Sequence, residues 1–153
     1  MPNHSENRKL LYSAEQMYQL VADVGKYPDF LPWCSAARIR SREIEGDREI
    51  MLADLVISFK VFRERFGSKV ILYPLVRQIE TEYLDGPFKF LKSSWKFTEI
   101  NENECEVDFF VNFEFKSRLL QSIIGVVFGE AMNRIVRAFE KRADELYGKN
   151  LVK

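Results

Sequence analysis

The clearest regular pattern in the chain is an alternation of apolar and polar residues from Cys105 to Phe115. Every second residue is apolar, and the residues between them are polar except Phe110. A period of two over such a length predicts a strand with one buried face and one face in water. Residues 51–59 alternate in a similar way, and Asp85-Gly86-Pro87 is typical of a turn. We therefore predict a run of strands from about residue 35 to residue 115.

Helical patterns precede and follow this run of strands. Ser13 begins the string S-A-E-Q, which predicts a capping box at a helix start. Ser117 is predicted to cap a helix that continues to about Tyr147, with Gly148 at its end. The first half of this helix, residues 119–128, is apolar nearly all round, so we expect it to be covered on most sides. Its second half is amphipathic, with one apolar face.

The remaining segments carry weaker signals. Residues 9–12 predict a short strand, and residues 1–6 and 149–153 are expected to be flexible tails of a single domain that spans 1–153. The prolines at positions 28 and 32 exclude a long regular element in residues 27–34, so a short helical turn or a structured loop is expected there.

This order of elements predicts the α+β class, because strands and helices are segregated along the chain. One long helix cannot cover a flat sheet of six or seven strands, so the antiparallel sheet is expected to curl around it. Such an arrangement leaves space between the two layers, and spaces of this kind are typical ligand sites.

Composition supports a thick apolar interior or a lined pocket, since aromatic residues make up 14% of the chain and 13 of them are Phe. Formal net charge is zero, which gives no global attraction to DNA or to an anionic membrane. The two cysteines, Cys34 and Cys105, lie far apart, so neither a disulfide framework nor a zinc site is expected.

The sequence also bears on location. No apolar signal region precedes the first helix, and no run of 18 apolar residues occurs. We therefore predict a cytoplasmic protein, with peripheral contact at the inner face of the cytoplasmic membrane as an open alternative.

Candidate catalytic chemistry is sparse. The single histidine, His4, lies in the expected tail, so no Ser-His-Asp or Cys-His arrangement is available. Phosphate-binding and metalloprotease motifs are absent from the sequence. A cyclase or hydrolase would need paired inward carboxylates, whereas the acidic residues fall mostly on faces predicted to be wet. The sequence thus predicts no catalytic residues, no metal ligands and no enzyme activity.

Several strings carry a family resemblance. They are YPDFLPWC (27–34), DLVISFKVFRERFGSKV (54–70), LDGPFKFLKSSWKF (84–97), VDFFVNFEFKSRLL (107–120) and AFEKRADELYG (138–148). In these strings the chain resembles the coenzyme Q-binding proteins of the START/polyketide-cyclase superfamily, whose fold is the helix-grip. It departs from them at Ser58, where such proteins often carry Gly, and at Gly67, where they often carry Thr.

The resemblance implies binding of ubiquinone, or a similar prenyl lipid, in support of cellular respiration, with no covalent cofactor. The same superfamily includes a bacterial branch of ribosome-associating toxins, so association with the ribosome stays open as the alternative function.

Candidate ligand-binding residues are the inward-facing positions of the strands and of the last helix. The predicted cavity wall comprises Phe59, Phe62, Glu64, Phe66, Trp95, Phe97, Phe109, Val111, Phe113, Leu120, Ile124, Val127, Phe128 and Ala131. The predicted lid, which is also the candidate for membrane contact, comprises Tyr27, Phe30, Leu31 and Trp33.

Some of these positions permit two interpretations. Glu64 is either a polar anchor for a ligand head group or a residue at a strand end that reaches water. Gly125 and Gly129 each cost helix stability, which suggests close approach of another surface or a ligand. Residues 38, 40 and 42 are alternating arginines that form either a small patch for rRNA or a solvated edge.

Overall fold

The computed structural model describes residues 3–59 and 62–148, with the side chains of Phe59, Phe62 and Val127 outside its described part. In chain order the elements are β1 (Asn3–Leu10), α1 (Ala14–Ala22), the 3-10 helix η1 (Val24–Asp29), β2 (Cys34–Glu45), β3 (Arg48–Phe59), β4 (Phe62–Tyr73), β5 (Gln78–Asp85), β6 (Phe88–Asn101), β7 (Glu104–Phe115) and α2 (Arg118–Tyr147).

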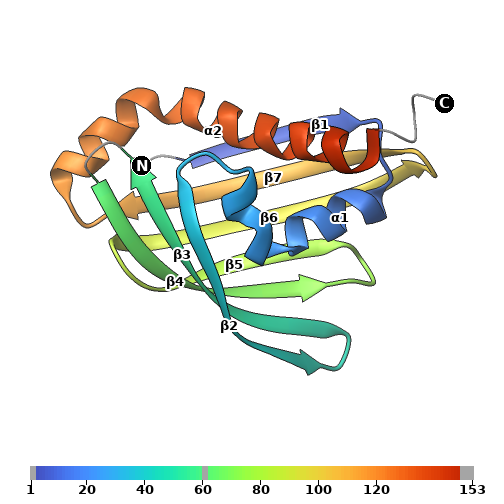
Figure 1. Ribbon diagram of the computed structural model, residues 1–153, viewed down its shortest axis with the longest axis horizontal. Coiled ribbons are helices and arrows are strands. Elements are labelled where there is room, and N and C mark those ends of the chain that lie inside the picture. The colour runs from blue at the N-terminus through green and yellow to red at the C-terminus, as the bar shows by residue number, and fades with distance from the viewer. Residues whose placement is uncertain (1–2, 60–61, 149–153) are drawn as a thin grey trace.

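The strands form one antiparallel sheet in the order β1-β7-β6-β5-β4-β3-β2. Because β1 pairs with β7, the first and last strands of the chain lie side by side, and α1 and η1 carry the chain to the opposite edge. Figure 1 shows that the sheet curves and that α1 and α2 lie on the same side of it. The predicted α+β fold, a curved antiparallel sheet with a long C-terminal helix, is confirmed.

Burial along β7 follows the predicted alternation. The residues from Cys105 to Phe115 at odd positions are all buried, whereas those between them are half-buried or exposed. These side chains face the helices and form the centre of the core together with rings from β6, such as Trp95 and Phe88. Strand alternation thus aims one row of large apolar side chains from each central strand into the space below α2.

Both predicted helix starts are confirmed. The Ser13 hydroxyl accepts from the Gln16 N–H, and the Gln16 side chain accepts from the Ser13 N–H, both at 3.0 Å. The Ser117 hydroxyl accepts from the Leu120 N–H at 3.2 Å, and α2 ends at Tyr147, as expected. These caps satisfy backbone groups that lack partners within the helix.

The two halves of α2 are held differently. In the second half, Glu140 pairs with Arg8 of β1, Asp144 accepts from the Tyr12 hydroxyl, and the Tyr147 hydroxyl donates to the Gln16 carbonyl at 3.2 Å. The first half meets the second at a bend of 70° between Val126 and Phe128. The second half is therefore fixed to β1 and α1 by polar contacts, whereas the first half extends beyond them.

The first strand begins earlier than predicted. β1 starts at Asn3 and ends at Leu10, whereas the sequence pattern predicted a strand over residues 9–12 and a flexible tail over 1–6. That prediction is wrong for residues 3–6, because alternate polar side chains are half-buried beside α2 in an edge strand and carry no apolar signal. Residues 1–2 and 149–153 lie outside the described residues.

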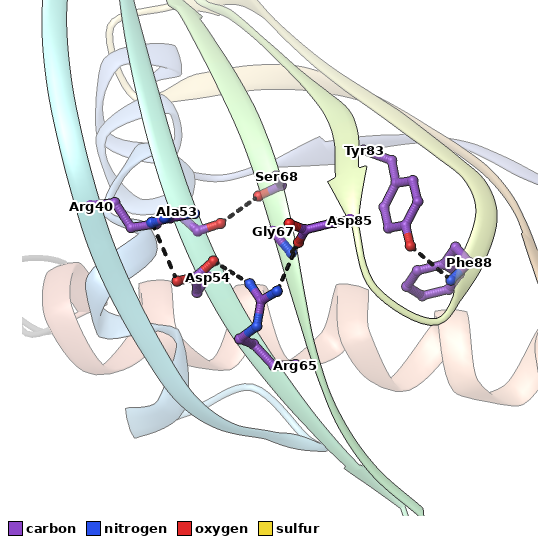
Figure 2. A network of polar contacts seen from close by, with 9 residues as sticks. All are labelled: Arg40, Ala53, Asp54, Arg65, Gly67, Ser68, Tyr83, Asp85 and Phe88. Atoms are coloured by element: carbon purple, nitrogen blue, oxygen red, sulfur yellow. Dashed lines mark hydrogen bonds and ion pairs between the residues drawn. The ribbon is translucent and has the colours of Figure 1, made fainter.

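A polar network fixes the turn between β5 and β6 (Figure 2). Arg65 bridges Asp54 at 2.7 Å and Asp85 at 2.9 Å, and the same Asp85 oxygen accepts from the Gly67 N–H at 3.2 Å. A Cβ atom at Gly67 would lie 2.7 Å from that oxygen. Glycine at this position therefore makes room for the carboxylate of Asp85.

Gly86, which follows Asp85 in the turn between β5 and β6, is equally constrained. Gly86 has φ +137°, and a Cβ there would lie 2.6 Å from the Cβ of Phe66. The Phe88 N–H then donates to the Tyr83 hydroxyl at 3.1 Å (Figure 2), and the Phe88 ring stacks on Phe115 with centroids 4.7 Å apart. The string D-G-P-F thus fits a turn that enters the core directly.

Among the described residues, no single helix has the length and apolarity needed to cross a membrane. The two parts of α2 on either side of the bend meet that criterion only when taken together, by length and composition.

Candidate ligand-binding cavity

A cavity of about 280 Å³ lies between the sheet, α2 and the segment that leads into β2, and it is partly open to solvent. Its volume is near the lower end of the range typical for small-molecule pockets, about 300–1,000 Å³. The lining residues are Tyr27, Leu31, Trp33, Leu55, Ile57, Phe66, Thr81, Phe88, Leu91, Ser93, Trp95, Phe109, Val111, Phe113, Phe115, Leu120, Ile123, Ile124, Ala131, Met132, Ile135 and Phe139.

The register between β6 and β7 places aromatic residues of the cavity wall beside one another. Trp95 of β6 lies opposite Phe109 of β7, and Leu91 lies opposite Phe113. Because side chains alternate between faces, these pairs all point to the helix side of the sheet. Residues from both halves of α2, between Leu120 and Phe139, form the facing wall of the cavity. The wall is therefore built mainly from the aromatic rows of the two central strands.

The described residues of the lining include no charged side chain. Thr81 of β5 and Ser93 of β6 are direct partners in the sheet, so two hydroxyl groups lie side by side in an otherwise apolar surface. The Tyr27 hydroxyl already donates to the Val21 carbonyl at 2.5 Å, and burial raises its pKa, so it stays neutral. Thr81 and Ser93 are thus the hydroxyl donors available to a ligand at this wall.

No activated nucleophile lies in the part of the lining that the structure describes. Burial raises the pKa of the Cys34 thiol to about 11 and that of the Cys105 thiol to about 11, and neither cysteine lines the cavity. Among the described residues, no three His, Cys, Asp or Glu side chains are grouped as a metal site would require. Thr81 and Ser93 have no acid or base beside them in the lining. This surface is suited to binding.

Many predicted wall residues do line the cavity. They are Phe66, Trp95, Phe109, Val111, Phe113, Leu120, Ile124 and Ala131. Phe97 is buried but faces α1, where its ring meets Tyr18 at 6.3 Å. Phe128 packs on Phe113 at 5.4 Å and is outside the lining. The side chains of Phe59, Phe62 and Val127 lie outside the described part of the structure.

Glu64 does not line the cavity, so its prediction as a wall residue is corrected. It lies opposite Ile57 near the start of β4, where it is exposed to solvent. Register places it on the helix side, as the alternation with Phe66 predicted, and its partner Ile57 lines the cavity, but Glu64 itself is exposed to solvent. Water can therefore solvate the carboxylate, which removes the cost of burying its charge.

The predicted lid is divided between cavity and core. Leu31 and Trp33 line the cavity together with Tyr27, whereas Phe30 packs edge-on against Phe139 at 5.3 Å. Trp33 has φ +65°, an uncommon conformation for a bulky residue, and its carbonyl accepts from the Ser58 N–H at 2.8 Å. This segment is therefore attached to β3 at one end and to α2 at the other.

Sequence patterns missed half of the lining. The missed residues are Leu55, Ile57, Thr81, Phe88, Leu91, Ser93, Phe115, Ile123, Met132, Ile135 and Phe139. Most of them share the parity of a predicted residue on the same strand or lie one or two helical turns from a predicted residue of α2, which was a usable signal. Thr81 has no predicted neighbour on β5, and Ser93 has the parity of Trp95 but is a hydroxyl residue, which fits either face of a sheet.

One further expectation, on the glycines of α2, needs correction. A Cβ atom at Gly125 or Gly129 would meet nothing within 4 Å among the described residues, so no close approach of another part of this chain explains these glycines. They lie on either side of the bend in α2, where glycine tolerates the altered geometry. Of the arginine row, Arg40 lies 3.7 Å from Asp54 and Arg42 2.5 Å from Glu49, and this pairing favours the solvated edge over the rRNA patch.

The family described as polyketide cyclase / dehydrase and lipid transport matches residues 10–140. A ribosome association toxin, RatA, from Rickettsia prowazekii is 38% identical and covers 95% of this chain and 99% of its own. The mitochondrial coenzyme Q-binding protein COQ10 homolog B of Xenopus laevis is 37% identical over 97% of this chain and 61% of its own.

Among solved structures, that of an 18 kDa protein from Caulobacter crescentus superimposes with a TM-score of 0.79 at 32% identity. It covers 97% of this chain and 99% of its own. The resemblance drawn from the sequence strings is confirmed by these matches.

Proposed function

Since the chain belongs to the polyketide cyclase / dehydrase and lipid transport family, we propose that it is a non-catalytic carrier for ubiquinone or a similar prenyl lipid. It would act in the cytoplasm, in support of respiratory electron transport. The observation that carries this proposal is the uncharged cavity wall, in which large apolar side chains surround one pair of hydroxyl groups.

The composition of the wall fits such a ligand. Each isoprene unit gains roughly 25 cal/mol for every Å² of apolar surface that it buries, and it needs no polar partner. A quinone carbonyl needs a hydrogen-bond donor, which the Thr81 and Ser93 hydroxyls offer and an ionised carboxylate such as Glu64 does not. The cavity has room for a head group and the first part of a tail, and the opening lets the rest of a long tail leave.

The direct test is to purify the protein from cells, extract it with organic solvent and identify what copurifies by mass spectrometry. We expect a prenyl quinone in the extract, and saturable binding when ubiquinone is added to the stripped protein. An extract without quinone, together with no binding of added ubiquinone, contradicts the proposal.

The hydroxyl pair provides a finer prediction. In the variant T81V/S93A, affinity for a prenyl quinone is expected to fall roughly 25-fold, because each lost hydrogen bond contributes about 1 kcal/mol. Affinity for a prenyl hydrocarbon without carbonyls is expected to change little, since the apolar contacts remain. Fluorescence titration of Trp95 and Trp33 with both ligands measures the difference, and equal losses for both would contradict the head-group role.

Association with the ribosome is the second candidate, because a relative at 38% identity is named for it. It predicts that the purified protein sediments with ribosomal subunits in a sucrose gradient. The compensated arginines of β2 offer little unpaired positive charge for rRNA, so the carrier function is placed first.

A further inference from the structure

The first half of α2 exposes an apolar stripe to solvent. Leu119 is 71% exposed and Val126 is 87% exposed, and Ile123 between them is also exposed. Spacings of four and three residues put these side chains on one face of the helix. The sequence pattern predicted that this half would be covered on most sides, but it is covered mainly along the adjacent face, where Leu120 and Ile124 line the cavity.

Charge near this stripe is positive. Lys116 and Arg118 are exposed immediately before Leu119, and neither makes an ion pair within the part of the chain that the structure describes. No acidic residue occurs from position 116 to position 129. Arg118 also occupies the first turn of α2, where the helix dipole favours an acidic side chain. An anionic partner would relieve that unfavourable placement.

The stripe adjoins the cavity. Ile123 belongs to both, since it is exposed to solvent and also lines the cavity wall. Leu120 and Ile124, its neighbours on the helix, line the cavity as well. An apolar ligand that left the cavity past this helix would meet the stripe before it met bulk water.

From these observations we propose that the first half of α2 docks on an anionic lipid bilayer, with Leu119, Ile123 and Val126 in the interface and Lys116 and Arg118 on the head groups. The inference rests on the proposed carrier function, because docking there would let a prenyl lipid pass between bilayer and cavity without crossing water. An interfacial helix of this kind lies in the plane of the membrane surface and does not span it.

The experiment is cosedimentation of the purified full chain with vesicles of phosphatidylcholine, alone or mixed with phosphatidylglycerol. We expect binding to the mixed vesicles that weakens with added salt. In L119E/V126E, binding is expected to fall by at least about tenfold, because apolar burial is lost and two negative charges are gained. In K116Q/R118Q, the preference for phosphatidylglycerol is expected to disappear.

The matched control is I44E/L75E. Ile44 and Leu75 are 81% and 75% exposed but lie outside the cavity lining, so this variant makes the same charge change elsewhere and is expected to bind vesicles like the unmodified chain. Circular dichroism checks that each variant is folded. L119Q/V126Q, which adds no charge, is expected to lose binding as well.

Each other outcome overturns the docking proposal. The first such outcome is that the unmodified chain does not bind vesicles. The second is that L119E/V126E and I44E/L75E lose vesicle binding equally. The third is that the stripe is needed for dimerisation or for sedimentation with ribosomes, whereas the chain does not bind vesicles. Quinone binding measured without vesicles separates the two proposals. If L119E/V126E binds quinone normally but not vesicles, docking is supported, whereas a chain that binds vesicles but never quinone contradicts only the carrier function.

Discussion

Replacing Ala131 with tryptophan is expected to abolish binding of the apolar ligand while leaving the protein folded. Ala131 is a buried residue of α2 whose side chain faces the cavity, so an indole at this position would enter space that the ligand needs. We expect affinity for ubiquinone to fall at least about 100-fold, which corresponds to about 2.7 kcal/mol of binding free energy. Titration of the stripped protein with ubiquinone measures this loss.

The matched control is A138W, which makes the same change on the same helix. Ala138 is half-buried and does not line the cavity, so ligand affinity is expected to stay near that of the unmodified chain. Thermal denaturation followed by circular dichroism shows whether A131W is folded. A folded A131W variant with unchanged affinity would show that the ligand binds elsewhere.

Substitution of alanine for Gly86 is expected to destabilise the fold by about 2–6 kcal/mol. Its φ of +137° lies in a region that residues with a side chain rarely adopt, and strain of that kind costs about 1–3 kcal/mol. The new Cβ would also lie 2.6 Å from the Phe66 Cβ and 2.9 Å from the Phe66 Cα. Because the backbone of Phe66 cannot move away without disturbing β4, this contact adds a packing cost of about 1–3 kcal/mol.

Gly46 provides the control for backbone conformation alone. It has φ +61° in the turn between β2 and β3, and a Cβ there would meet nothing within 4 Å. G46A is therefore expected to cost about 1–2 kcal/mol, from the left-handed conformation only. Urea denaturation of both variants gives the two free energies of unfolding, and a loss in G86A no greater than that in G46A contradicts the argument from close approach.

Sequence patterns were most informative where one physical effect dominated. The alternation of apolar and polar residues from Cys105 to Phe115 predicted a strand with one buried face. The hydroxyls of Ser13 and Ser117 were predicted to accept hydrogen bonds from free backbone N–H groups at helix starts. These features are local, so the one-dimensional order of residues contains them. The fold class followed from their order along the chain.

Features that depend on pairing between distant segments were less predictable. β1, which begins at Asn3, forms because its polar residues pair with the backbone of β7 along the edge of that strand. No periodic apolar pattern in the sequence predicts it. The adjacency of Thr81 and Ser93 depends on the register between β5 and β6. Glu64 has the parity of a wall residue, yet the strand end at which it lies is open to water, and parity alone does not reveal where a cavity ends.

The contacts of Glu140 and Asp144 with β1 and the loop after it leave the two ends of α2 with unequal local stabilities. Segments with few fixed contacts open at a lower free energy than the global unfolding reaction. The residence time of a ligand in the cavity would then be set by fluctuations of the early turns of α2. Mutations that raise the melting temperature by stabilising the late turns would leave the release rate of the ligand unchanged.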